Sequence, residues 1–149
     1  MLLITQIEND LTQSLKQGEK TIAMTLRLLK AALHNEQIAQ KQQQSEITDE
    51  IVLAVLKREV KKRREAREAF AAAGRVEQAL AEENEMKILE KYLPVQLTVE
   101  EIEQRVKIVI DGLDQSEKNI GTAMKKVMAS IGAQADGKIV SDIVKKLLN

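Results

Sequence analysis

The chain has 149 residues, with one tyrosine, one phenylalanine and no tryptophan or cysteine, and its 23 basic side chains balance 23 acidic ones. This composition excludes disulfides, thiolate metal sites and a cysteine nucleophile, and a net charge of zero gives no global attraction to nucleic acid or to an anionic membrane. Because aliphatic residues must form the core and only one proline interrupts the chain, we expect an all-α fold.

Two stripes of apolar residues at helical spacing open the chain. The first consists of Leu3, Ile7, Leu11 and Leu15, and the second of Ile22, Leu26, Leu29 and Leu33. Gly18 separates them, so we predict two amphipathic helices with a break at this glycine. The start of the chain has no basic leader region and no apolar segment of spanning length, so we expect a cytoplasmic protein without a membrane partner.

A polar run at 40–45 predicts a loop before a third helix, which Thr48 should cap and Gly74 should stop just after Ala73. A fourth helix should then run to Leu93, where Pro94 ends it. We place the domain boundary at this proline, with an N-terminal helical domain at 1–94 and a C-terminal three-helix domain at 95–149.

Opposite charges follow each other on the third and fourth helices. Residues 57–67 hold seven basic and two acidic side chains, a net of +5, and residues 77–90 hold five acidic and one basic, a net of −4. An antiparallel hairpin would bring these two runs together, so we favour mutual neutralisation over the alternative of an RNA-binding stripe.

Three short helices should form the C-terminal part. Thr98 and Glu101 predict a capping box for the first of them, and a second is expected at 120–131. The last should begin at Asp136, whose carboxylate can accept from the free N–H groups of the first turn, while Gly137 allows close packing at the entry.

Side chains for catalysis are scarce. His34 is the sole imidazole and sits within a predicted helix, so a solvated or packed histidine is the better interpretation than a catalytic one. Adjacent acids such as Glu82 and Glu83 point apart on a helix and read as surface charge. We find no metal-ligand spacing, phosphate-binding glycine loop or dinucleotide motif, and we expect no cofactor and no metal.

Short motifs in a specific order give the chain a family resemblance. They are Arg27-Leu28-Leu29-Lys30-Ala31-Ala32, Asn35-Glu36-Gln37-Ile38, Glu59-Val60-Lys61-Lys62-Arg63, Ala73-Gly74-Arg75, Tyr92-Leu93-Pro94, Gln96-Leu97-Thr98, Glu100-Glu101, Gly121, Met124, Met128 and Ala135-Asp136-Gly137-Lys138. Over nearly its whole length the chain resembles the YqeY-like family, whose GatB/YqeY domain also forms the tail of the B subunit of the tRNA-dependent amidotransferase.

The resemblance implies an all-helical, two-part fold whose small C-terminal domain contacts tRNA in the amidotransferase tail. It implies no catalysis by this chain alone, because the glutamine-dependent carbon–nitrogen ligase chemistry belongs to other parts of that assembly. The chain departs from the family where basic residues and a proline are common, and it carries Thr122, Ala129, Ser130, Ala133 and Gln134 there. These departures should weaken phosphate attraction and loosen the loop.

Our leading hypothesis is a non-catalytic module that binds either tRNA or an enzyme that handles tRNA. We expect it not to bind DNA. Residues 118–149 hold six basic and two acidic side chains, a net of +4, against two basic and six acidic for 95–117, a net of −4. The candidate RNA-binding residues are Lys125, Lys126, Lys138, Lys145 and Lys146. Two alternatives are a helical protein-interaction adaptor and amidotransferase activity within a larger assembly. Gly121, Asp136 and Gly137 can be read equally as folding or functional positions.

Overall fold

A computed structural model describes residues 2–40 and 46–149, and its regular elements are helices, as the composition predicted. They are α1 (Leu3–Gln17), α2 (Lys20–Ala39), α3 (Asp49–Ala72), α4 (Val76–Glu90), α5 (Val99–Asp111), α6 (Ile120–Ile131) and α7 (Gly137–Leu148), with 3-10 turns η1 (Gln115–Glu117) and η2 (Gly132–Gln134). Contacts divide the chain into an N-terminal unit, 1–93, and a C-terminal unit, 94–149. Of the loop predicted at 40–45, residues 41–45 lie outside the described residues.

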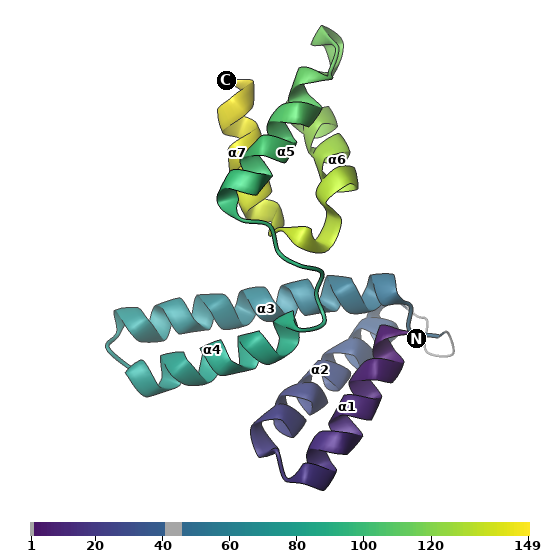
Figure 1. Ribbon diagram of the computed structural model, residues 1–149, viewed down its shortest axis with the longest axis vertical. Coiled ribbons are helices and arrows are strands. Elements are labelled where there is room, and N and C mark those ends of the chain that lie inside the picture. Colours follow the sequence, from purple (N-terminus) through teal and green to yellow (C-terminus); the bar gives the residue numbers. More distant parts are fainter. Residues whose placement is uncertain (1, 41–45) are drawn as a thin grey trace. The chain divides into compact units, whose positions relative to one another are not determined.

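The N-terminal unit consists of two helical hairpins, in which α1 packs on α2 and α3 packs on α4 (Figure 1). Both hairpins contribute to one aliphatic core, because each helix turns its apolar stripe toward the others. The buried members of this core are Ile7, Leu26, Leu29, Leu33, Val52, Val55, Leu56, Val60, Met86, Leu89 and Tyr92. Tyr92 is the aromatic side chain in that set, and the rest are aliphatic or Met.

The turn between α3 and α4 is closed by Gly74, as its position predicted. Its φ of 75° lies in the left-handed region, where a side chain at Cβ is unfavourable. The Gly74 N–H donates to the Ala71 carbonyl at 3.1 Å, and the Arg75 N–H donates to the Phe70 carbonyl at 2.8 Å. This pair of bonds is a Schellman motif, which satisfies carbonyls that the helix end leaves free.

Helix α4 ends at Glu90, so the prediction that it continues to Leu93 was wrong by three residues. The Tyr92 N–H donates to the Leu89 carbonyl at 3.1 Å, and the Leu93 N–H donates to the Glu90 carbonyl at 3.0 Å. These bonds span three residues instead of four, so the last turn tightens before the proline. Pro94 disfavours helical backbone in the residue before it, which leaves the end of α4 upstream of Leu93.

A buried guanidinium joins α3 to α4. Arg63 is only 8% exposed, and its Nη1 donates to Glu59 Oε2 at 2.9 Å and to the Glu59 carbonyl at 3.2 Å. Its Nε lies 3.4 Å from Glu85 Oε2 on α4 but lacks the geometry of a hydrogen bond. Arg67 makes a second cross-helix ion pair, at 3.9 Å from Glu83. Mutual neutralisation of the two charge runs is therefore confirmed for these two arginines.

The C-terminal unit packs α5, α6 and α7 around a second aliphatic core. Its buried members are Ile102, Val106, Ile110, Leu113, Ala123, Val127, Ile131, Ala135, Val140, Ile143 and Val144. The predicted capping box is confirmed: the Glu101 N–H donates to Thr98 Oγ1 at 3.2 Å, and the Thr98 N–H donates to Glu101 Oε2 at 2.9 Å. Asp136 also caps α7, because its Oδ1 accepts from the Lys138 N–H at 2.9 Å.

Two glycines near the turn from α6 to α7 differ in whether their backbone conformation requires glycine. Gly132 has φ 58° and ψ −130°, a conformation that L side chains rarely adopt. At Gly137, by contrast, an added Cβ would meet nothing within 4 Å. The expectation that Gly137 permits close packing at the helix entry was therefore wrong, because the cap needs the Asp136 carboxylate and not the small residue after it.

We expect Arg63→Ala to lower the free energy of unfolding by about 2 kcal/mol, since it leaves Glu59 and Glu85 without their buried partner. The matched control is Lys62→Ala. Lys62 also pairs with Glu59, at 3.4 Å, but its side chain is 72% exposed, so its removal should cost at most about 0.5 kcal/mol. Urea denaturation of both variants checks the difference, and equal losses would contradict a specific role for the buried guanidinium.

Gly132→Ala should destabilise the C-terminal unit by about 1 to 3 kcal/mol, because alanine is strained at this backbone conformation. Gly137→Ala lies in the same unit and should leave stability unchanged or raise it by about 0.5 kcal/mol, since it restricts only the unfolded chain. Thermal unfolding followed by circular dichroism compares the two. A loss at Gly137 as large as that at Gly132 would refute the assignment.

Candidate functional site

Helices α6 and α7 carry the five lysines that the sequence singled out. In α6 the core takes Ala123, Val127 and Ile131, which leaves Lys125 and Lys126 exposed. In α7 the core takes Val140, Ile143 and Val144, and the remaining lysines are exposed: Lys138, Lys145 and Lys146. The helical period thus directs all five ammonium groups to solvent.

Two of the five lysines are neutralised within the unit. Lys126 Nζ makes a short hydrogen-bonded ion pair with Glu117 Oε2 in η1, and Lys146 Nζ lies 3.9 Å from Glu103 Oε1 in α5. The hydrogen bond from Lys126 holds the pKa of the Glu117 carboxyl below its usual range. Both acids come from the acidic segment 95–117. Part of the negative charge of this segment is therefore paired with lysines of α6 and α7.

The other three lysines, Lys125, Lys138 and Lys145, make no ion pair with any residue in the described ranges 2–40 and 46–149. Lys138 and Lys145 are seven residues apart on α7, which places them on one face and about 10 Å apart along the axis. Asp142 lies on α7 between them at helical spacing and is also exposed. This face therefore presents two ammonium groups and one carboxylate.

The other motif residues occupy places that the fold explains. Met124 and Met128 are partly buried and pack against the C-terminal core. Asp136 caps α7, as described above. Gly121 lies in the first turn of α6, where an added Cβ would be 3.5 Å from Asn119 Oδ1, an ordinary contact distance.

The turn that contains two of the family departures, Ala133 and Gln134, is bonded to the segment that precedes α5, mostly through its backbone carbonyls. The Leu97 N–H donates to the Gln134 carbonyl at 2.8 Å, and Gln96 Nε2 donates to the Ala133 carbonyl at 3.0 Å. Gln134 Nε2 also lies 3.4 Å from the Val95 carbonyl. These bonds tie residues 95–97 to the turn after α6, contrary to the looser loop that the departures suggested. Sequence reasoning missed them because they join residues 37 to 39 positions apart.

On α3, part of the basic run is also accounted for. Arg58 pairs with Glu36 of α2 at 2.6 Å, which holds the pKa of the Glu36 carboxyl below its usual range. Lys57 and Lys61 have no ion pair within the part of the chain that the structure describes. Ion pairs therefore hold four of the seven basic side chains in this run: Arg58, Lys62, Arg63 and Arg67.

His34 is exposed on α2, in agreement with a solvated histidine. A search of the described residues finds no cluster of three or more His, Cys, Asp or Glu side chains able to hold a metal ion. Within the same residues, no helix has the length and apolar character needed to cross a bilayer.

Comparison with known proteins places these features in a family. The family described as Yqey-like protein matches residues 4–148, nearly the full chain. The chain belongs to the YqeY-like family. The resemblance seen in the short motifs is thereby confirmed.

Two fungal proteins are similar to this YqeY-like chain. "Altered inheritance of mitochondria protein 41, mitochondrial" of Pyrenophora tritici-repentis is 25% identical over 150 residues, which cover 99% of this chain and 81% of the relative. An uncharacterized protein of Schizosaccharomyces pombe is 35% identical over 88 residues, covering 59% of this chain and 69% of the relative.

Proposed function

We propose that this YqeY-like protein is a non-catalytic RNA-binding accessory module that contacts tRNA through residues 95–149. The observation that carries the proposal is the set of lysines on α6 and α7 that have no acidic partner among the described residues, namely Lys125, Lys138 and Lys145. Unpaired ammonium groups are free to replace the counterions condensed on a phosphate backbone, and this exchange drives sequence-independent binding. Residues 1–94 would act as a separate helical domain.

The family resemblance supports tRNA as the nucleic acid. The tail of the amidotransferase B subunit has the same kind of domain and contacts tRNA there, so the proposed setting is tRNA handling beside such an enzyme. Phosphate contacts position a protein without reading base sequence, so the expectation that the chain does not bind DNA rests on the family resemblance and not on the lysines. A cytoplasmic location goes with this proposal, although the Pyrenophora relative is named as mitochondrial.

A protein-interaction adaptor is the alternative, and the packing of α7 argues against it. Val140, Ile143 and Val144 of its apolar stripe are buried in the unit's own core. Ile139 and Leu147 remain 37% and 39% exposed, which is too little apolar surface for a dedicated docking face. Recovery of a stoichiometric protein partner without RNA from a pull-down would reverse this ranking.

Participation in glutamine-dependent carbon–nitrogen ligation is the third candidate, and it would require the larger amidotransferase assembly. The test is to add the purified protein to that enzyme and to measure the rate of transamidation. An unchanged rate removes this candidate and leaves the RNA-binding proposal intact.

We expect the triple variant Lys125→Glu, Lys138→Glu and Lys145→Glu to lose at least about tenfold in tRNA affinity, because three phosphate contacts become repulsive. The slope of log affinity against log salt should fall by about two to three. Fluorescence anisotropy of labelled bulk tRNA at several salt concentrations measures both quantities, with single-stranded RNA and duplex DNA as comparisons.

The matched control changes the same number of exposed basic residues in the N-terminal unit: Lys16→Glu, Lys20→Glu and Arg27→Glu. It alters net charge equally, so a general electrostatic effect would lower affinity in both variants. Equal losses, or binding unchanged in the first variant, would contradict the assignment of the site to α6 and α7.

Glu117→Gln should strengthen tRNA binding about two- to threefold, because it frees Lys126 for a phosphate and removes a nearby negative charge. The control is Glu100→Gln, which removes an exposed carboxylate of α5 that makes no ion pair with the described residues. If both changes raise affinity equally, the effect comes from net charge and not from the release of Lys126.

A further inference from the structure

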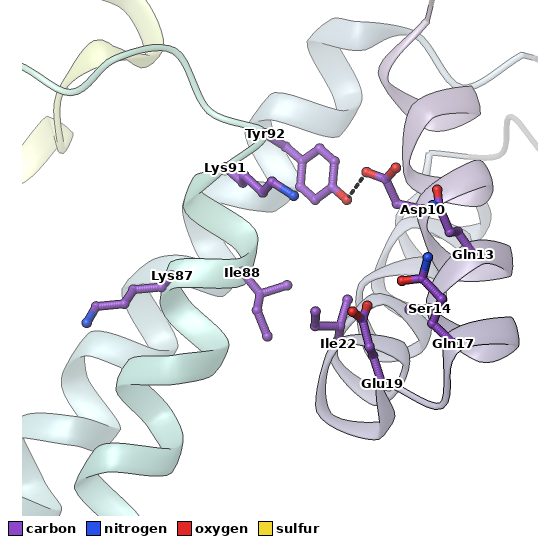
Figure 2. Close-up of a pocket in the computed structure, with 10 residues that line it drawn as sticks. All are labelled: Asp10, Gln13, Ser14, Gln17, Glu19, Ile22, Lys87, Ile88, Lys91 and Tyr92. Carbon is purple, nitrogen blue, oxygen red and sulfur yellow. Dashed lines mark hydrogen bonds between the residues drawn. The ribbon is translucent and has the colours of Figure 1, made fainter.

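A groove of about 410 Å³ opens on the N-terminal unit, between the α1–α2 hairpin and the end of α4 (Figure 2). Its volume is within the range of small-molecule sites. Ile22 of α2 and Ile88 of α4 lie opposite each other in it, and both are partly buried against the N-terminal core. The groove therefore has an apolar base that can pack against the hydrocarbon part of a ligand.

One wall of the groove is fixed by a long-range hydrogen bond. The Tyr92 hydroxyl donates to Asp10 Oδ2 at 2.5 Å, across 82 residues of sequence. Tyr92 is 7% exposed, and burial together with the bond to Asp10 raises the pKa of its hydroxyl well above the usual range. The tyrosine thus stays a donor at neutral pH and holds the Asp10 carboxylate in place.

Charged atoms on the two sides of the groove are left without protein partners. Within the described ranges, Asp10 Oδ1, the Glu19 carboxylate and the Lys91 ammonium make no hydrogen bond or ion pair. Lys91 lies beside the Tyr92 ring in Figure 2, but no ion pair within 4.0 Å joins it to either acid. Opposite charges that share a groove without pairing can both be satisfied by one ligand that carries both signs.

Lys87 also borders the groove but plays a different part. Its side chain points away from the other residues drawn in Figure 2, and its Nζ lies 3.8 Å from Glu83 of the same helix. The charged groups that face the groove are therefore two carboxylates and one ammonium, beside the uncharged Gln13, Ser14 and Gln17. This balance matches a ligand with two cationic groups and one carboxylate.

We propose that this groove binds a basic amino acid, with its two cationic groups at Asp10 and Glu19 and its carboxylate at Lys91. The methylene chain would lie on Ile22 and Ile88. The Tyr92 hydroxyl acts as a positioning group, since it orients Asp10 and leaves Oδ1 free to accept from the ligand. This site shares no residue with the lysines on α6 and α7. Amino-acid binding can therefore be tested separately from RNA binding.

Titration of the full-length, ¹⁵N-labelled protein with L-lysine tests the proposal by NMR. We expect saturable shifts for backbone amides near Asp10, Glu19 and Lys91 at about 10 mM ligand, where a millimolar site is nearly full. Cadaverine lacks the carboxylate and norleucine lacks the side-chain ammonium, so each should bind at least about tenfold more weakly than L-lysine. No saturable shift with L-lysine, or equal binding of all three compounds, would overturn the proposal.

Asp10→Asn and Glu19→Gln should each weaken L-lysine binding about tenfold, because each removes one charge-assisted contact. The amide oxygen of Asn can still accept from the Tyr92 hydroxyl, so the fold should be retained, which a urea denaturation curve verifies. Lys87→Ala is the control and should leave binding unchanged. Equal weakening by Lys87→Ala, or no effect of the two acid variants, would contradict the assigned contacts.

Discussion

The burial of aliphatic helix faces is the constraint on which the rest of this structure depends. With one tyrosine and one phenylalanine in 149 residues, the core must come almost entirely from Leu, Ile, Val, Ala and Met, with Tyr92 as its aromatic member. These residues form two clusters that share no member, one in each unit. Each unit must therefore close its own core. The two proposed binding sites therefore use charged side chains on the surfaces of α6 and α7 and the groove of the N-terminal unit.

Local chemistry allowed much of this fold to be predicted from the sequence. An N-cap needs a particular side chain at a particular spacing, and Thr98 and Asp136 each supply one that the structure confirms. The C-terminal end of α3 needs a residue that tolerates positive φ, and Gly74 supplies it. The end of α4 was missed because the influence of Pro94 reaches several residues upstream, and the tightened turn at Tyr92 leaves no separate signal in the sequence.

Contacts between residues far apart in the sequence could not be predicted from the sequence. The helical period tells which face of a helix is buried, but it does not tell which ion pairs form on the exposed side. Thus the pairing of Lys126 with Glu117 and of Lys146 with Glu103 was not foreseen, and neither was the bond from Tyr92 to Asp10. These contacts decide which of the charges counted in the sequence are available to a partner.

Ion pairs within the protein determine how many of the charges counted in the sequence each candidate surface can offer to a partner. On α3, acids of α2, α3 and α4 pair with four of the seven basic side chains in the run of net charge +5, namely Arg58, Lys62, Arg63 and Arg67. On α6 and α7 a smaller excess leaves three ammonium groups unpaired in the described structure. For a protein of zero net charge, such a local excess is the feature that can attract a polyanion.

The most direct test of tRNA binding by α6 and α7 is to map the contact by NMR, using ¹⁵N-labelled full-length protein with and without tRNA. We expect shifts or line broadening concentrated at Lys125, Lys138, Lys145 and their neighbours on α6 and α7. Perturbation centred instead on Lys57 and Lys61 of α3, or no perturbation at low salt, would contradict it.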